Sequence, residues 1–359
     1  MNIEQTTQAY ERWMAGHFRL LRTDLAAKHA HMVGDPFSFL RATFYRWAQL
    51  FPALCPELAR SPKVLGVGDL HAENYGTWRD AEGRLNWGIN DFDEACPLPY
   101  TNDLVRLATS ACLAIELKHL PIRSAVAYAA ILEGYTDGLK DGGQPFVLSE
   151  RNRWLRTIVT SRLRDPTLFW KKLAALPSVR RVPDSVRSLL KRAMPEAGLE
   201  FRVAHRQAGL GSLGRPRFTA IADWNGGKIA REAKALLPSA WLWAGGGAGS
   251  TRVFYNTILR GAVRAADPCL QMHERWILRR LSPYCSRIEL SQIPRERDSE
   301  RLLRAMGYEL ANVHLGTSGT AVRVGSDLRR RKSAWLRQSS EVMAAATLKD
   351  WKRWRKIYA

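Results

Sequence analysis

Acidic residues are scarce in this sequence. It has 34 Asp and Glu against 55 Lys and Arg, so its formal net charge is +21 at pH 7. A field of this sign attracts phosphates, whether they belong to nucleotides, nucleic acids or anionic lipids. Part of the excess lies in residues 349–356, where Trp351 and Trp354 alternate with basic residues. Such a run is more typical of a solvated helix whose Trp side chains pack inward than of a nucleic-acid-binding surface.

The sequence also lacks any Cys-x-x-Cys pair and any long apolar run. Its five cysteines are widely scattered, which argues against a disulfide framework and against a zinc knuckle. No apolar run approaches the roughly 20 residues needed to span a bilayer. We therefore expect a soluble, cytoplasmic protein without a membrane span.

What the sequence does contain is enough apolar residues for a large core and more than one lobe. It has 359 residues, of which 46% are hydrophobic. Apolar periodicity predicts two helices over 3–60, a helix from 102 to about 117, further helices through 130–195 and helices from 298 to the end. Residues 201–208, 217–224 and 229–235 have strand patterns, and 269–281 is typical of a hairpin.

These patterns predict an α+β protein made of three parts. We expect a helical lobe over 1–198 and a smaller β-rich lobe over 199–292. Helices over 293–359 should then pack back on the first lobe.

Oxygen-bearing side chains follow two short strand patterns near the start of the chain. The strand over 64–67 leads into a loop with Asp69 and Asn74, and the strand over 85–90 leads into Asp91 and Asp93. Phosphoryl transfer to a hydroxyl needs a base and oxygen ligands that hold Mg²⁺ against the phosphates. Asp69 and Asn74 have the spacing of the base Asp and the metal-binding Asn of kinase catalytic loops. Carboxylate and amide oxygens also suit Mg²⁺.

The two loops resemble a known signature. Gly-Asp-Leu-His-Ala-Glu-Asn over 68–74, with Ile-Asn-Asp-Phe over 89–92, resembles the Gly-Asp-x-His-x-x-Asn…Ile-Asp-Phe signature of aminoglycoside phosphotransferases and choline kinases. A longer stretch, from Asp35-Pro36-Phe37 to the segment over 103–110, is similar to the uncharacterised bacterial family numbered 2252 among domains of unknown function.

The kinase resemblance implies roles for five residues. Asp69 would be the base or the substrate-orienting group, and His71 would brace its loop. The Mg²⁺ ligands would be Asn74 and Asp91, with Asp93 as an auxiliary acid. The sequence departs from the signature at position 67, where a Val replaces the His that usually anchors the loop.

A glycine-rich loop follows much later, between two strand patterns. Its Gly-x-Gly-x-x-Gly pattern can lay backbone N–H groups over the phosphates of ATP. A Rossmann fingerprint would instead need a helix directly after the loop. The residues predicted to bind nucleotide here are Gly209, Gly211, Ser212 and Gly214.

The strand over 229–235 supplies a basic residue where kinases carry their phosphate-binding Lys. Arg231 and Lys234 are both candidates, and the sequence leaves the choice open. Glu232 is the only nearby acidic residue that could pair with the chosen cation, since 235–266 contains no Asp or Glu before Asp267. The plainer interpretation is a β-hairpin with surface Arg and Lys.

The order of these motifs differs from that of ordinary kinases. There the glycine loop, basic strand, hairpin, hinge and a helix ending in Leu-x-x-x-His precede the catalytic loop. Here the catalytic loop comes first, and the hairpin over 269–281, a candidate hinge over 282–293 and a helix ending in Leu310 to His314 come last. We therefore expect a protein-kinase-like, two-lobed fold that is circularly permuted.

The sequence thus predicts an ATP- and Mg²⁺-dependent phosphotransferase that acts on an unidentified hydroxyl of a small molecule or a protein. The leading alternative is a non-catalytic, pseudokinase-like or nucleic-acid-binding protein, because the usual acidic partner and the His at position 67 are missing. Transfer of AMP in place of phosphate would use much the same ligands. A binuclear phosphoesterase, which Asp69-x-His71 also suggests, lacks its downstream Gly-Asn-His element.

Overall fold

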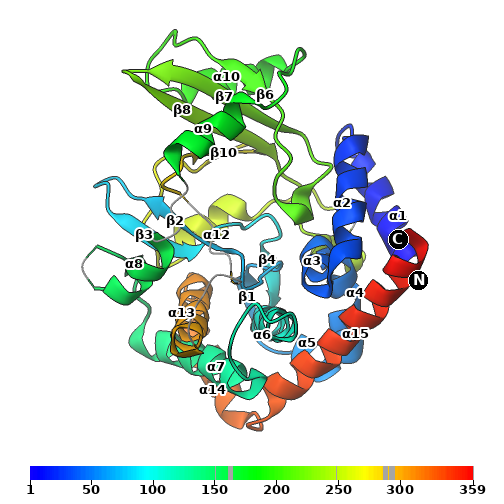
Figure 1. Ribbon diagram of the computed structural model, residues 1–359. Helices are drawn as coiled ribbons and strands as arrows, with labels where there is room; N and C mark the ends of the chain where they lie inside the picture. The colour runs from blue at the N-terminus through cyan, green and yellow to red at the C-terminus, as the bar shows by residue number, and fades with distance from the viewer. Residues whose placement is uncertain (150, 161–164, 248, 286–289, 291–295, 359) are drawn as a thin grey trace.

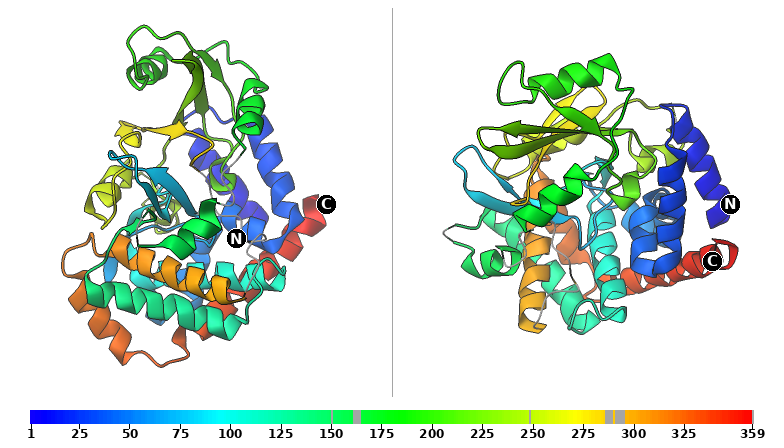
Figure 2. Two further views of the ribbon diagram at one scale, coloured as in Figure 1. Left: turned by 60° about the vertical axis from the view of Figure 1, so that its left-hand side comes forward. Right: turned by 45° about the horizontal axis from the view of Figure 1, so that its top comes forward.

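Two lobes of different composition face each other in the computed structural model (Figure 1). The structure describes residues 1–149, 151–160, 165–247, 249–285, 290 and 296–358. The further views in Figure 2 show the smaller, sheet-containing lobe at one end of the molecule and the helices α7 and α13 toward the other. The candidate hinge over 282–293 falls mostly outside the described residues.

The smaller lobe is built on an antiparallel sheet with strand order β6-β7-β8-β10-β9. A two-residue turn, Asn225-Gly226, joins β7 to β8, and both of its residues have positive φ, as tight hairpin turns require. The predicted strands and the predicted hairpin are confirmed, although the first strand is shorter than expected. The five strands are β6 (Arg202–Ala204), β7 (Arg217–Trp224), β8 (Gly227–Ala235), β9 (Gln271–His273) and β10 (Trp276–Leu281).

Helices α9 (Pro166–Ala174) and α10 (Asp184–Arg192) cover opposite faces of this sheet. Phe169 of α9 packs in a cluster with Ala230, whereas Leu190 of α10 packs with Ala233. These clusters are separate from the core of the larger lobe. Helices α9 and α10 therefore pack with the sheet of the smaller lobe, and the division with a boundary at 198 stays a prediction.

The larger lobe packs its helices around one apolar core. Asp35 caps its third helix, because the Asp35 side chain accepts a hydrogen bond from the Ser38 backbone N–H at 2.7 Å. The helices are α1 (Ile3–Ala15), α2 (Arg22–Gly34), α3 (Pro36–Ala42), α4 (Phe44–Leu54), α5 (Pro56–Ala59), α6 (Tyr100–Glu116), α7 (Ser124–Asp141), α8 (Arg153–Thr160), α11 (Ala240–Ala244), α12 (Tyr255–Gly261), α13 (Glu296–His314), α14 (Thr320–Arg330) and α15 (Trp335–Tyr358).

Short strands of the larger lobe lead into the two acidic loops. β1 pairs with β4, and β2, β3 and β5 form a second small sheet, in which β2 was not foreseen from the sequence. Because β1 and β3 end where the acidic loops begin, the ladders fix both loops at one side of the lobe. The strands are β1 (Lys63–Gly66), β2 (Tyr75–Arg79), β3 (Leu85–Ile89), β4 (Cys96–Pro99) and β5 (Phe146–Val147).

The last helices pack against the first ones. Asp350 of α15 forms an ion pair with Arg46 of α4 at 2.6 Å. Trp354 is fully buried and donates from its indole to the His29 carbonyl, while the basic residues around it are exposed. The tail is thus a helix with packed Trp and solvated charges. In the part of the chain that the structure describes, no helix has the length and apolar character to cross a membrane.

Helices α7 and α13 cross at glycines. A Cβ on Gly134 would lie 1.9 Å from the Arg304 carbonyl oxygen, and one on Gly307 would lie 2.1 Å from the Ile131 carbonyl oxygen. Only glycine allows backbones to approach this closely. This contact places His314, at the end of α13, beside the first acidic loop.

We predict that Gly134→Ala lowers the free energy of unfolding by about 1–3 kcal/mol, because the added methyl group overpacks the α7–α13 crossing. The control is Gly34→Ala, where no atom lies within 4 Å of the new Cβ; it should stay within about 1 kcal/mol of the parent. Urea unfolding of both variants provides the measurement. Equal stabilities of the two variants would contradict the close crossing.

Candidate functional site

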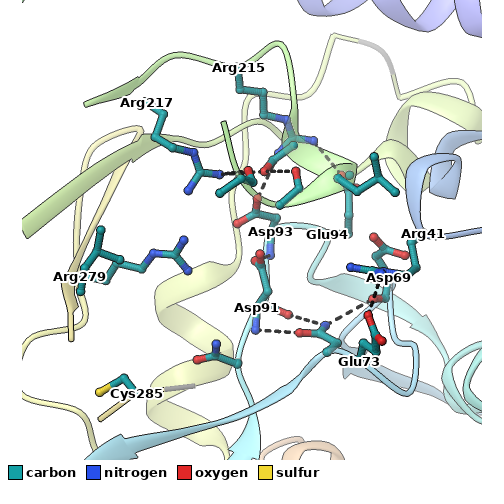
Figure 3. Close-up of a pocket in the computed structure, with 18 of the residues that line it drawn as sticks. Arg41, Asp69, Glu73, Asp91, Asp93, Glu94, Arg215, Arg217, Arg279 and Cys285 are labelled. Carbon is teal, nitrogen blue, oxygen red and sulfur yellow. Dashed lines mark hydrogen bonds and ion pairs between the residues drawn. The ribbon is translucent and has the colours of Figure 1, made fainter. Parts of the chain in front are cut away.

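A cleft between the lobes collects charged side chains from both (Figure 3). Figure 3 shows Asp91 and Asp93 near its centre, Asp69 and Arg41 on one side, and Arg217 and Arg279 reaching in from the smaller lobe. The sequence-predicted residues that line it are Asp69, His71, Asn74, Asp91, Asp93, Gly209, Gly211 and Ser212. The structure therefore brings the early acidic loops and the late glycine loop to one place.

The loop that carries Asp69 is anchored by a buried carboxylate. Asp103 of α6 accepts hydrogen bonds from the backbone N–H groups of Val67 at 2.7 Å and Gly68 at 2.9 Å. The Nε2 of His314 lies 3.0 Å from Asp103 Oδ2, and its Nδ1 lies 2.8 Å from the Tyr135 hydroxyl. Since the carboxylate can only accept, His314 donates to it through Nε2. This network therefore anchors the loop, which has Val67 at the position discussed above.

Asp69 is oriented by a buried arginine. Arg106 of α6 donates to Asp69 Oδ1 through Nε at 3.0 Å and through Nη2. The guanidinium is fully buried and stacks on the rings of Phe44 and Trp47. Burial raises the pKa of Asp69 even though Arg106 opposes this shift. The second oxygen, Oδ2, faces the glycine loop, because a Cβ on Gly211 would lie 3.2 Å from it.

His71 and Asn74 shape the same loop. His71 Nδ1 accepts a hydrogen bond from the Glu73 backbone N–H at 3.2 Å, which fits the predicted bracing role. Asn74 joins the two acidic loops, since its Nδ2 donates to the Asp91 carbonyl at 2.9 Å and its Oδ1 accepts from the Asp91 N–H at 3.0 Å. Only the second lone pair of Oδ1 is left for a metal ion. Its role as a Mg²⁺ ligand stays a prediction.

Lys234 extends from β8 to the second acidic loop. Its Nζ lies 2.6 Å from Asp93 Oδ1 and 3.1 Å from Asp91 Oδ2, and its side chain is 2% exposed. Arg231 points to the opposite face of β8, where its Nε donates to the Ala193 carbonyl at 3.0 Å. Neither side chain is among those that line the cleft, but of the two candidates Lys234 alone contacts Asp91 and Asp93.

Asp91 and Asp93 differ in pKa and in exposure. Burial would raise the pKa of Asp91, but the Lys234 ammonium and a hydrogen bond from Asp93 hold it below its ordinary value. Burial and the negative charge of Asp91 raise the pKa of Asp93 to about 6. The side chain of Asp91 is 37% exposed and that of Asp93 only 9%. Asp91 is thus the ionised carboxylate that a ligand can reach.

A metal ion at this site would need oxygen ligands from its nucleotide. Among the residues that the structure describes, no three His, Cys, Asp or Glu side chains converge into a metal site of their own. Mg²⁺ in nucleotide sites is usually held by one or two carboxylates together with phosphates and water. An exposed, ionised Asp91 fits that arrangement.

The glycine loop lies beside the first acidic loop and includes a short 3₁₀ turn, η1 (Leu210–Ser212). The carbonyl of Gly211 accepts a weak hydrogen bond from Lys28 of α2 at 3.4 Å. Gly214 lies outside the cleft: its carbonyl accepts from the Leu21 N–H, and Leu25 fills the space where its Cβ would be. The structure therefore gives Gly214 a packing role in place of the predicted nucleotide-binding one.

Arg215 joins the lobes at a point that the sequence did not reveal. It follows the glycine loop, and its Nη2 donates to Glu94 Oε1 at 2.9 Å, while its Nη1 lies 3.4 Å from Asp93 Oδ2. Glu94 also accepts from the Ala240 N–H at 2.6 Å. The sequence indicated this contact only indirectly. The segment from Asp91 to Glu94 carries three acidic residues, and such residues require cationic partners if they are buried.

Glu232 lies fully buried beneath the cleft face of the sheet. Its Oε1 accepts from Arg217 at 2.5 Å and Arg279 at 2.7 Å, and its Oε2 accepts from Arg206 at 2.7 Å. Burial would raise the pKa of Glu232, but the three guanidinium groups hold it well below its ordinary value. Glu232 does not pair with Lys234, as the sequence suggested it could.

Comparison with known families gives one match. The model of a family described as "Uncharacterized protein conserved in bacteria (DUF2252)" matches residues 20–166. The match spans α2 to the start of α9 and so includes both acidic loops, but it stops before the glycine loop and Lys234. Comparison with curated proteins and with solved structures found no match.

We predict that Asp103→Asn lowers the free energy of unfolding by about 2–5 kcal/mol. In the parent, the two carboxylate oxygens accept from several buried N–H groups, whereas the NH₂ group of an asparagine cannot accept and would leave buried donors without a partner. The matched control is Asp137→Asn, which removes an ion pair to Arg304 at a side chain that is 42% exposed and should cost at most about 1 kcal/mol. Chemical unfolding measures both. Similar losses would argue against Asp103 as the anchor of the loop.

Proposed function

We propose that this chain is an ATP- and Mg²⁺-dependent phosphotransferase with a circularly permuted, kinase-like fold. The observation that carries the proposal is the ion pair of Lys234 with Asp91, two residues that lie 143 positions apart. A basic strand residue set against the metal-binding Asp of a catalytic site is what the kinase resemblance implies. The chain forms this contact although its catalytic loop precedes its glycine loop.

The neighbours of the catalytic loop support the permutation. The helix ending in Leu310 to His314 normally precedes that loop, and here His314 hydrogen-bonds Asp103, the residue that anchors it. Helix α15 returns to α4 through the Arg46–Asp350 ion pair, so the two ends of the chain pack in one lobe. Circular permutation is tolerated where chain ends lie close together.

In the proposed reaction Asp69 receives or orients the proton of the acceptor hydroxyl at Oδ2. Arg106 fixes the other oxygen, so the free one keeps its direction. Positioned proton transfer of this kind contributes about a hundredfold to ten-thousandfold in rate. Since Gly211 lies against Oδ2, the glycine loop must move aside before an acceptor reaches it.

The other residues would hold the nucleotide. Backbone N–H groups of Gly209 to Ser212 and the ammonium of Lys234 would contact the phosphates. Asp91, with Asp93 beside it, would hold Mg²⁺. The metal ion, when bound, neutralises charge on the phosphates. If the phosphates of a nucleotide paired with Lys234, the carboxylates of Asp91 and Asp93 would both become free to bind the metal ion.

A non-catalytic, pseudokinase-like protein is the second candidate. It is favoured by Asn74, whose amide already bridges the loops through both of its polar atoms, and by Lys234, which already neutralises the acidic pair without a metal. Transfer of AMP would use the same groups. The label transferred from α- or γ-labelled ATP to an acceptor in cell extract separates these possibilities.

We predict that Asp91→Asn abolishes the rise in melting temperature given by ATP with Mg²⁺, because the metal loses its exposed carboxylate. Asp69→Asn should keep that rise and lose transfer of the γ-label, since Asp69 acts on the acceptor. The matched control is Asp223→Asn, at a side chain that is 81% exposed on the sheet hairpin. Behaviour like that of the control in both variants would reject the proposed function.

A further inference from the structure

The cleft carries more positive charge on its sheet side than one nucleotide-binding lysine accounts for. Three arginines, from the segment before the glycine loop, from β7 and from β10, converge on the single carboxylate of Glu232. One glutamate balances only one of them, so two positive charges remain at this wall of the cleft. Figure 3 shows Arg217 and Arg279 extending from the sheet toward the space above Asp91.

Two of these arginines present a free edge to the cleft. Arg206 contacts Glu232 Oε2 through Nε and Nη2, both at 2.7 Å. Arg279 contacts Oε1 through Nε at 2.9 Å and Nη2 at 2.7 Å. Among the described residues, the Nη1 groups of both arginines have no hydrogen-bond partner. Both side chains line the cleft and are 19% and 23% exposed.

Arg217 has a different role. Its Nη2 donates to the Ala208 carbonyl at 2.8 Å and to the Ser212 hydroxyl at 3.0 Å, and its Nη1 is used by Glu232. It is only 4% exposed. Arg217 therefore stabilises the glycine loop through hydrogen bonds. Of the three arginines, only Arg206 and Arg279 have an Nη1 group left to bind a ligand, within the part of the chain that the structure describes.

The geometry points to a phosphate-binding subsite formed by Arg206 and Arg279 and held in place by Glu232. A guanidinium whose Nε and Nη2 are fixed by a carboxylate loses little freedom when it binds a second anion through Nη1. A phosphate offers several acceptor oxygens and up to two negative charges, which match two neighbouring guanidinium groups. A carboxylate would neutralise only one of them.

This subsite does not depend on phosphoryl transfer, and its ligand is either the phosphate chain of the nucleotide or a phosphate carried by the second substrate. Both sources share one chemistry, a phosphate with free oxygens. The probe that tests it is inorganic tripolyphosphate in the presence of EDTA, so that no metal at Asp91 contributes to binding. Calorimetric titration of the full chain measures the affinity.

We expect the parent chain to bind tripolyphosphate, and Arg206→Gln and Arg279→Gln each to weaken binding by about tenfold to a hundredfold, the usual loss for a charge-assisted hydrogen bond. Arg192→Gln, at an exposed position at the end of α10 on the far side of the sheet, is the matched control and should bind like the parent. Arg279→Lys keeps a positive charge beside the buried Glu232 carboxylate. It removes only the planar guanidinium group, whose Nη1 is proposed to bind the phosphate. It should fold like the parent and still bind more weakly.

Two further arms complete the test. Asp91→Asn should retain tripolyphosphate binding even where it loses ATP with Mg²⁺, so failure of the proposed function and failure of the subsite give different results. Displacement of tripolyphosphate by ATP would assign the subsite to the nucleotide, and simultaneous binding would assign it to a phosphorylated second substrate. Absence of binding by the parent, or equal binding by Arg279→Lys and Arg192→Gln, would overturn the subsite.

Discussion

The burial of one lysine ammonium between two aspartates sets how the lobes of this protein meet. An unpaired ammonium at 2% exposure would cost several kcal/mol, so Lys234 stays buried only while Asp91 and Asp93 of the other lobe face it. Arg215 adds a second link of the same kind, to Glu94 and Asp93. Four buried or half-buried carboxylate contacts therefore tie the sheet to the acidic loops. A ligand that binds Lys234, Arg215 or one of their carboxylate partners would break a contact between the lobes and could change how the lobes pack.

Charge is separated across the cleft. Carboxylates dominate on the larger lobe, where Asp69, Asp91 and Asp93 lie, and guanidinium groups dominate on the sheet side around Glu232. A phosphate chain with a bound cation has the complementary polarity, since its oxygens suit the arginines and its metal suits the aspartates. The net charge of +21 is thus not spread evenly over the cleft, since Asp69, Glu73, Asp91, Asp93 and Glu94 make the wall on the larger lobe acidic. This polarity supports a nucleotide more specifically than the overall charge does.

Local spacing was enough to predict the parts of the site that lie within one segment. The loop from Asp69 to Asn74 and the strands of the sheet lobe depend on residues close in sequence, so their patterns indicated them. The anchor of the loop was missed, because Asp103 and His314 lie 211 positions apart and only tertiary packing brings them together. The choice of Lys234 over Arg231 was also left open, although Glu232 and Lys234 must share one face of a strand by the two-residue alternation of side chains. Gly214 was predicted to bind nucleotide because the sequence does not distinguish a glycine required for packing, here against Leu25, from a glycine required for phosphate binding.

The sequence also does not indicate with which lobe α9 packs. The amphipathic pattern of α9 indicates a helix with one apolar face, but it does not say whether that face meets the sheet or the helical core. The most direct test of the whole account is a crystal structure with Mg²⁺ and a non-hydrolysable ATP analogue. The account predicts phosphates between residues 209–212 and Lys234, with the metal ion on Asp91. A nucleotide bound outside this cleft, or Lys234 still paired with both aspartates and no nucleotide beside it, would contradict it.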